Sequence, residues 1–222
     1  MLIRNDLSDP FIAACGQLPL SRRLQFKSGE VIYAERPRDS VFIVLRGYVR
    51  SLYTQPDGRS WTRMIFGKGA LLGDLPFCPG HFVTDEQLVA NGPVSLVKLS
   101  RGTLEDAATS NSKLELLLLR TLSSQLQFLD RRMHWQLVSP LRSRIARALE
   151  DLMCFAAGRC GHGHLVDVRM THEEFSQLVV AARPAVSEVL KEFKAAGLID
   201  YTRSHLCLLQ MEALHTIARA IP

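Results

Sequence analysis

The sequence lacks the features of a membrane protein and of a secreted protein. No stretch approaches about eighteen consecutive apolar residues, so no membrane-spanning helix is predicted. Arg4, Asp6 and Asp9 surround only a short apolar run, unlike a secretory signal peptide. The five cysteines are odd in number and scattered, which argues against a disulfide framework. These absences predict a cytoplasmic protein without membrane contact.

Motifs for catalysis are also missing. The chain has no nucleophile elbow, P-loop or GxGxxG. A metal-dependent β-barrel enzyme needs two or three converging histidines, whereas residues 20–99 hold only His81. The group formed by Cys154, Cys160, His162 and His164 matches no structural zinc spacing, and a glycine-rich hairpin loop is favoured there. We therefore expect no enzyme.

The charge is compatible with a nucleic-acid partner without identifying one. A chain of 222 residues can form one large or two modest domains, and its formal net charge is +5. Acidic and basic residues nearly balance within residues 138–222, however. A DNA-binding surface there must therefore gather its positive charge on one face.

Residues 171–199 contain the most informative pattern, two short amphipathic helices joined by a tight turn. Thr171 and Glu174 form a capping box at the first helix. Arg183 and Pro184 open the second helix, and Gly197 ends it. The apolar positions that define the inner faces are Phe175, Leu178 and Val179, then Val186, Val189, Leu190 and Phe193. This arrangement is typical of a DNA-binding helix-turn-helix, although an ordinary helical hairpin has the same periodicity.

The flanking segments favour the DNA-binding interpretation. His164–Met170 alternates as a short strand, and Ile199–Leu209 reads as a strand, a polar turn and a second strand. Such a hairpin directly after a recognition helix is a wing. It would offer Arg203 and His205 to the phosphate backbone.

The first hundred residues have a different character. Residues 20–99 are dense in short strand signals, with turn chemistry at Gln55–Gly58 and glycines at close intervals. Many short strands at this spacing predict a closed barrel or jelly roll. The fold class expected for the whole chain is therefore α+β.

Residues 100–137 predict a short helix capped by Ser100 and then a long helix. One stripe of this long helix is apolar, and the other face is polar. The stripe predicts a homodimer seam, with packing against the chain's own barrel as the alternative. The stripe comprises Leu114, Leu118, Leu122, Leu126, Leu129 and Met133, and the last five form the predicted dimer interface.

A β-barrel, a long helix and a winged helix-turn-helix, in this order, resemble the Crp/Fnr superfamily of bacterial transcription regulators. The resemblance covers roughly Leu18 to Ile217. Matching residues in the N-terminal part are Phe26, Gly29, Glu30, Ile32, Asp39, Phe42, Ile43, Gly47, Val49, Asp57, Gly58, Gly69–Asp74 and Ala90. In the C-terminal part they are Arg144–Ala146, Arg183, Val186, Ser187, Leu190, Lys191 and Gly197–Ile199.

The resemblance implies three parts and a mode of action. Residues 1–110 would form an effector-sensing barrel domain with short flanking helices, residues 111–137 a dimerisation helix, and residues 138–222 the DNA-binding domain. In such regulators a small effector re-poses two recognition helices, which bind a roughly palindromic operator in double-stranded DNA. RNA polymerase is an implied partner, and activation is the family's common mode.

Arg183 aligns with the family's base-reading arginine, and a guanidinium there can bond a guanine, whereas a phosphate contact is the alternative. Pro184 and Glu188 depart from the cyclic-AMP members, so the operator should differ from theirs. The residues expected at DNA are Thr171, His172, Arg183, Pro184, Ser187, Glu188, Lys191 and Arg203.

The same resemblance places the effector pocket at Gly73, Asp74, Leu75, Glu86 and Gln87. Cyclic-nucleotide members hold the phosphate with an arginine and a serine or threonine, but the matching stretch here is Thr84–Gln87. Asp85 and Glu86 would repel a phosphate, so cyclic AMP is not expected and the effector stays unidentified.

The positions of the cysteines bear on two further classes of regulator. Iron–sulfur sensing needs an N-terminal cysteine cluster, and only Cys15 lies there. Cys78 and His81 lie where haem-containing carbon monoxide sensors of the superfamily place axial ligands, so haem is a minority hypothesis beside a plain loop. A non-enzymatic interaction module with a degenerate helix-turn-helix is the other alternative.

Overall fold

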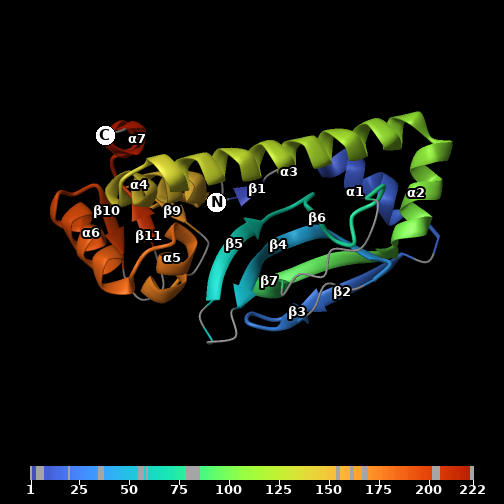
Figure 1. Cartoon of the computed structure of the whole chain (residues 1–222), viewed down its shortest axis with the longest axis horizontal. Coiled ribbons are helices and arrows are strands. Elements are labelled where there is room, and N and C mark those ends of the chain that lie inside the picture. Colours follow the sequence, from blue (N-terminus) through green and yellow to red (C-terminus); the bar gives the residue numbers. More distant parts are fainter. Residues whose placement is uncertain are drawn as a thin grey trace. The chain divides into compact units, whose positions relative to one another are not determined.

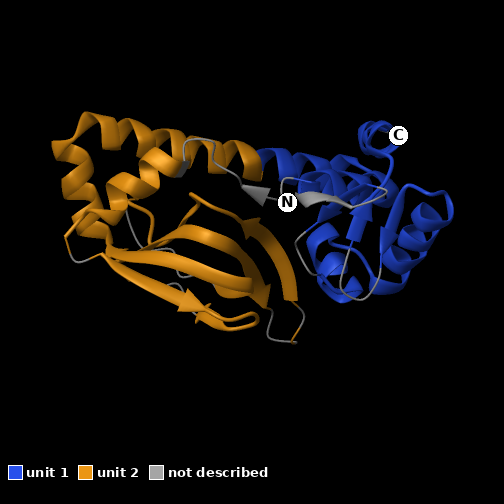
Figure 2. Ribbon diagram, turned by 180° about the vertical axis from the view of Figure 1, so that it is seen from behind, with its two compact units in different colours: residues 1–2, 130–222 blue, residues 3–129 orange. Residues whose placement is uncertain are grey.

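The computed structural model describes residues 2–3, 8–19, 21–34, 38–54, 58, 60–78, 86–153, 156–160, 163–166, 170–201 and 206–220. The described residues divide into two compact units, coloured separately in Figure 2. One comprises residues 3–129 and is called the sheet unit here. The other comprises residues 1–2 and 130–222 and is called the helix-turn-helix unit.

The sheet unit is built on two long antiparallel strands, β4 and β7 (Figure 1). Among the described residues, the sheet runs β1-β5-β4-β7-β2, with β3 also pairing with β7 and β6 with β4. β4 and β7 pair along almost their whole length, from Ser40 opposite Ser100 to Tyr53 opposite Glu86. The bounds are β1 Leu2–Ile3, β2 Arg22–Phe26, β3 Val31–Tyr33, β4 Ser40–Thr54, β5 Ser60–Phe66, β6 Leu71–Gly73 and β7 Glu86–Ser100.

Bulges bend these long strands. The β4–β7 register shifts twice between Val44 and Tyr48. Gly47 lies within this irregular stretch with φ of +83°, and a Cβ there would come within 2.2 Å of the Pro93 carbonyl oxygen. Only glycine fits that approach, so the predicted barrel glycine has a packing reason.

The sheet has an apolar core on each face because alternate residues of β4 point to opposite sides. Phe42 and Val44 belong to one core with Met64, Phe66 and Leu88. Val41 and Ile43 belong to the other, which is closed by α1 (Ser8–Gly16), α2 (Arg101–Ser110) and the start of α3 (Ser112–Val138). This arrangement of strands and helices confirms the predicted α+β class.

The helix-turn-helix unit begins within α3 and continues into α4 (Leu141–Leu152), α5 (His172–Val179), α6 (Arg183–Ala195) and α7 (Met211–Arg219). Its described strands are β8 Ala156–Cys160, β9 Gly163–Val166, β10 Ile199–Tyr201 and β11 Leu206–Leu208, in the order β10-β11-β9-β8. The predicted wing is therefore the β10–β11 hairpin. The helix α7 was not predicted, and its Leu214 and Ala218 are fully buried.

Candidate nucleic-acid interface and effector domain

The second helix of the motif, α6, begins and ends where the sequence predicts. Pro184 lies in its first turn, where a missing N–H costs no hydrogen bond. At its end, the Leu198 amide donates to the Phe193 carbonyl (2.9 Å) and the Gly197 amide to the Lys194 carbonyl (3.0 Å). Gly197 has φ of +67°. This is a Schellman motif, and it fixes the length of α6.

One face of α6 is buried, and the opposite face is exposed to solvent. Val186, Leu190 and Phe193 are buried, and Val189 is half-buried, as predicted. Four of the residues predicted at DNA form the exposed face, namely Arg183, Pro184, Glu188 and Lys191. Because positions 183, 187 and 191 recur at intervals of four, they lie along one side of the helix. The structure thus leaves a polar helix face open to solvent.

The remaining predicted contacts at the start of α5 already have partners. Thr171 is exposed, but its hydroxyl and the Glu174 carboxylate form the predicted capping box. The His172 ring lies 2.9 Å from the Ser187 hydroxyl through Nδ1 and stacks edge-on against Tyr201. His172 and Ser187 are both half-buried. They join α5, α6 and β10, which holds the exposed face of α6 in place.

Two arginines hold the end of α5, and the sequence did not predict this role for either of them. Arg132, on the last turns of α3, is 7% exposed and donates to the Leu178 carbonyl at 2.8 Å. Arg144, on α4, donates to the carbonyls of Val179 (2.9 Å) and Val180 (3.2 Å). The last carbonyls of a helix lack partners within the helix and carry partial negative charge. The two guanidiniums therefore satisfy the carboxyl end of α5, just before the turn.

The turn itself contains Val180 in the left-handed conformation, with φ of 52°. The following amide, that of Ala181, donates to the Ser176 carbonyl at 3.1 Å. A β-branched residue is disfavoured there by roughly 1–2 kcal/mol, so the surrounding contacts must hold it.

Charged pairs flank α6. Lys194 contacts the Asp200 carboxylate at 2.7 Å, and this hydrogen bond raises the pKa of Lys194. Arg142 of α4 pairs with Glu192 and lies over the Phe193 ring. These pairs neutralise charge beside the exposed face, which leaves Arg183 and Lys191 as its cations. The predicted wing contacts Arg203 and His205 lie outside the described residues.

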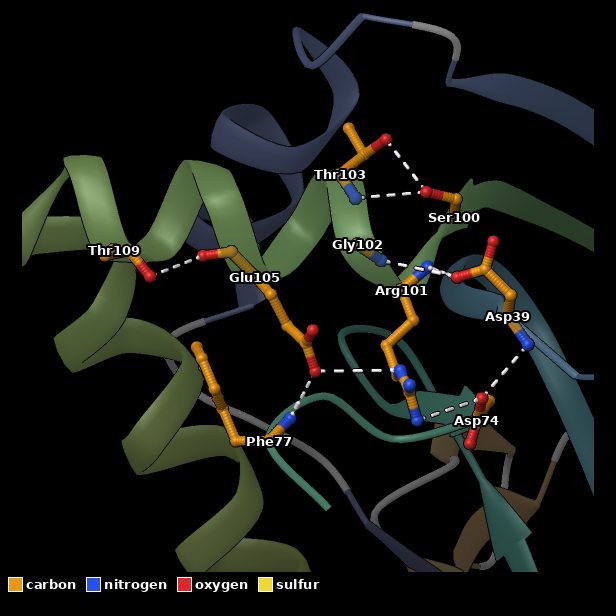
Figure 3. Close-up of polar contacts among 9 residues, drawn as sticks. All are labelled: Asp39, Asp74, Phe77, Ser100, Arg101, Gly102, Thr103, Glu105 and Thr109. Atoms are coloured by element: carbon orange, nitrogen blue, oxygen red, sulfur yellow. Dashed lines mark hydrogen bonds and ion pairs between the residues drawn. The ribbon is translucent and has the colours of Figure 1, made fainter. Parts of the chain in front are cut away.

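In the sheet unit, the predicted pocket residue Asp74 is closed off by its own neighbours (Figure 3). Asp74 is 6% exposed, accepts from the Asp39 amide at 3.0 Å and pairs with the Arg101 guanidinium at 3.3 Å. Figure 3 shows Arg101 between Asp74 and Glu105, whose carboxylate also accepts from the Phe77 amide at 2.6 Å. The network joins the segment after β6 to the start of α2, so Asp74 has a structural role.

The residue before this network, Gly73, has no room for a side chain. Its φ is +87°, and a Cβ would lie 2.4 Å from the Ser40 carbonyl oxygen. Gly73 lies opposite Val41, where β6 pairs antiparallel with β4. Leu75 is half-buried and packs into the core beneath α1 and α2.

Glu86 is buried at the other end of β7 and is saturated by protein donors. Its carboxylate accepts from Arg63 and Ser51, each at 2.6 Å, and from the Tyr33 hydroxyl at 3.1 Å. Arg63 therefore neutralises Glu86, and the repulsion predicted for a phosphate no longer rests on this carboxylate. Gln87 is half-buried opposite Leu52. Thr84 and Asp85 lie outside the described residues.

The cysteines differ in environment. Cys78 is exposed, whereas Cys15 and Cys207 are buried. Burial raises the pKa of the Cys15 thiol to about 12, so this thiol stays protonated in the core. His81, the predicted partner of Cys78 at haem, lies outside the described residues. Within the described part of the chain no group of three or more His, Cys, Asp or Glu side chains could hold a metal ion.

The predicted dimer stripe on α3 is wrong for Leu118. Leu118 is 1% exposed and packs with Leu114 into a core of the sheet unit, and Leu122 packs against the same core. Leu129 packs against the other core, whereas Leu126 and Met133 are 68% and 58% exposed. Each step of four residues turns an α-helix by about 40° beyond a full turn, so a stripe with that spacing winds around the helix.

The exposed apolar residues of α3 follow a different pattern. They are spaced alternately by three and four residues, with two polar positions, and we call them the exposed seam. The seam consists of Leu116, Leu119, Ser123, Leu126, Asp130, Met133 and Leu137, all exposed. This heptad spacing keeps the seam on one face of the helix.

No described helix is long and apolar enough to cross a membrane.

Most of the chain matches known protein families and known proteins. Residues 23–111 match the model of the cyclic nucleotide-binding domain, and residues 143–217 match that of the Crp-like helix-turn-helix domain. The CRP-like cAMP-activated global transcriptional regulator of Mycobacterium tuberculosis is 27% identical over 205 residues, covering 90% of this chain and 91% of that protein.

Two further proteins are similar to this chain over most of their length. The transcriptional regulator SdrP of Thermus thermophilus is 26% identical over 202 residues, covering 89% of this chain and 94% of that protein. The structure of FixK2 from Bradyrhizobium japonicum shares the fold, with a TM-score of 0.78 at 20% identity, covering 90% of this chain and 98% of that one. The Mycobacterium tuberculosis and Thermus thermophilus relatives are transcription regulators rather than enzymes. The chain therefore belongs to the Crp/Fnr superfamily of bacterial transcription regulators.

Proposed function

We propose that the protein is a dimeric, sequence-specific DNA-binding regulator that places α6 in the major groove of a roughly palindromic operator. The observation that carries this proposal is the division of α6 into a buried apolar face and an exposed polar face headed by Arg183. In a helix-turn-helix, residues at the start of the second helix reach the base edges. A guanidinium there can bond the O6 and N7 atoms of a guanine together.

The test is selection of binding sites from random-sequence DNA, followed by affinity measurements on the selected operator. Arg183→Ala should lose roughly 1–3 kcal/mol of binding free energy and relax the preference at one base pair per half-site. Lys191→Ala is the matched control, because it removes one positive charge from the same exposed face. It should weaken binding to all sequences alike and reduce the salt slope by about one. Equal weakening of every sequence by Arg183→Ala would reduce Arg183 to a phosphate contact.

The exposed seam of α3 supports the dimer. Burying a leucine side chain is worth roughly 1.5–3 kcal/mol, so pairing two such seams offers enough apolar area for a stable helix pair. Leu126→Glu should therefore produce a monomer. Gln127→Glu, which introduces the same charge at the next exposed position off the seam, should leave the dimer intact. Light scattering at micromolar concentration separates the outcomes, and a monomeric parent protein would contradict the proposal.

We also propose that cyclic AMP is not the effector. Asp74 is already held by Arg101 and by the Asp39 amide, so its carboxylate is not free for a ligand hydroxyl. The core against which β3, β4, β5 and β7 pack is apolar, and its charged neighbour Glu86 is paired. An effector of this domain would be small and largely apolar. Calorimetry with cyclic AMP should show no binding, and a micromolar dissociation constant would overturn this assignment.

A further inference from the structure

Ser187 lies on α6 one turn after Arg183, and its hydroxyl is held by another helix of the motif. A hydroxyl inside a helix often donates to the carbonyl four residues earlier. Thr109 and Thr216 do so in α2 and α7, at 2.9 and 3.0 Å. In the described part of the chain, the hydroxyl of Ser187 instead contacts α5, where its Oγ lies 2.9 Å from Nδ1 of His172.

His172 is itself fixed in place. It is the first residue of α5 and half-buried, and its ring meets the Tyr201 ring edge-on, with the centroids 5.3 Å apart. Lys194 of α6 holds Tyr201 in turn, because its ammonium lies 4.9 Å from the ring centroid and donates to the Tyr201 carbonyl at 3.1 Å. The orientation of His172 toward Ser187 is therefore set by contacts from α5, α6 and β10.

A hydroxyl held in this way offers DNA fewer choices than a rotating one. A serine hydroxyl has one proton and two lone pairs, so a free one can donate to or accept from any base edge. A hydroxyl that donates to the imidazole can only accept from a base. A hydroxyl that accepts from the imidazole directs its own proton away from the ring. In either tautomer of His172, the bond restricts what Ser187 presents.

The bond also has a purely structural interpretation, in which it only joins α5 to α6. The two helices already pack through their buried inner faces, however. Ser187 is half-buried and lies between the exposed residues Arg183 and Lys191 on one side of α6. A polar bond at the border of the exposed face is placed to control what that face offers to a ligand.

We propose that His172 is a positioning residue for operator recognition, which fixes the hydroxyl of Ser187 so that Ser187 discriminates one base pair in each half-site. The inference rests on the proposed function, because Ser187 reaches a base only if α6 enters the major groove. The sequence predicted both residues at DNA. In this arrangement His172 influences specificity through Ser187 and needs no base contact of its own.

The test compares affinities for the selected operator and for its single-base-pair variants. His172→Phe keeps a ring beside Tyr201 and removes the nitrogen that faces Ser187. Ser187→Ala removes the hydroxyl. We expect both changes to reduce discrimination at the same base pair, from roughly five- to tenfold in the parent to within about twofold. The double variant should match Ser187→Ala within about twofold, because the two residues act as one unit.

Two further variants separate positioning from a structural role. His172→Asn can place a polar atom close to the position of Nδ1, and it should restore discrimination to about threefold or more. Lys194→Gln loosens the contact of α6 with β10 and leaves the partners of Ser187 unchanged. It should weaken binding to all sequences alike and keep the base preference. Discrimination is a ratio of two affinities of one sample, so partial unfolding of a variant does not alter it.

Three results would overturn the inference and leave the proposed function intact. In the first, His172→Phe weakens all sequences alike and keeps the preference, which would make His172 structural or a phosphate contact. In the second, Ser187→Ala leaves every base preference unchanged while Arg183→Ala relaxes one. In the third, His172→Asn and His172→Phe lose discrimination equally. Selection that yields no preferred sequence would instead contradict the proposed function, and this inference with it.

Discussion

The two units hold their buried charges in opposite ways. Among the described residues of the sheet unit, the buried charged side chains are the carboxylates of Asp74 and Glu86, and both accept several bonds from neighbouring donors. Among the described residues of the helix-turn-helix unit, the buried charged side chain is that of Arg132, which donates to the Leu178 carbonyl. A carboxylate can be saturated by three or four donors, whereas a guanidinium has five N–H groups and is harder to satisfy. The two buried carboxylates of the sheet unit are therefore saturated, whereas in the helix-turn-helix unit the buried Nε atoms of Arg144 and Arg147 have no hydrogen-bond partner within the described part of the chain.

The largest expected effect concerns Glu86. Glu86→Ala leaves Arg63, Ser51 and Tyr33 without their shared acceptor. It should lower the free energy of unfolding of the sheet unit by about 2–4 kcal/mol. Urea unfolding followed by Trp61 fluorescence, in a Trp135→Phe background, measures it. Glu115→Ala, an exposed carboxylate on α3, should cost less than about 0.5 kcal/mol. If Glu86→Ala and Glu115→Ala lowered the free energy of unfolding by similar amounts, the hydrogen bonds to Glu86 would not stabilise the sheet unit.

The corresponding change in the other unit is Arg144→Met, which keeps the length of the side chain and removes its donors. The carbonyls of Val179 and Val180 then lose their partner at the end of α5. We expect a loss of about 1–3 kcal/mol, read from Trp135 fluorescence in a Trp61→Phe background. Arg142→Met breaks an exposed ion pair and should cost no more than about 1 kcal/mol. If Arg144→Met were as stable as the parent protein, Arg144 would not stabilise the carboxyl end of α5.

A smaller effect is expected at the opposite end of α5. Thr171→Ala removes the capping box with Glu174 and should cost about 1 kcal/mol in the helix-turn-helix unit. Thr171→Ser keeps the hydroxyl and should stay near the parent value. The same two variants, tested on the selected operator, separate capping from DNA contact. If Thr171→Ala weakens operator binding while the unit stays equally stable, the predicted DNA contact holds after all.

The smallest expected effect is visible only as a change with pH. Burial raises the pKa of Asp151 above its value in the unfolded chain. Its favourable contribution is therefore present at acidic pH, below the unfolded pKa of about 3.9, and is lost as pH rises through the folded pKa. Asp151→Asn should accordingly be more stable than the parent at pH 7, with an advantage that shrinks on acidification. A constant difference across this range would contradict the raised pKa.

Local signals in the sequence were sufficient to predict the helix-turn-helix. The capping box at Thr171, Pro184 in the first turn and Gly197 at the end act over only a few residues, so their spacing alone defines α5 and α6. The division of α6 into inner and outer faces follows from the same periodicity. The α+β class could also be predicted, because the first part of the sequence is rich in strand signals and the remainder in helix signals.

Contacts across long separations could not be read in the same way. Nothing in the sequence links Asp74 to Arg101 or Arg132 to Leu178, because each pair meets only after the strands and helices have packed. For the same reason the leucines of α3 did not reveal which of them face the sheet unit. Leu118 and Leu119 are adjacent and chemically identical, yet one is 1% exposed and the other 60%.

Gly73 has a consequence for how such chains are recognised. Its Cβ is forbidden by the Ser40 carbonyl oxygen on β4, and its positive φ disfavours any other residue. Both constraints arise where β6 pairs antiparallel with β4, and neither depends on a ligand. A chain could lose its effector altogether and still be compelled to keep this glycine. Gly73 is thus a marker of strand architecture, and its presence alone cannot distinguish a sensing domain from one that has become a scaffold.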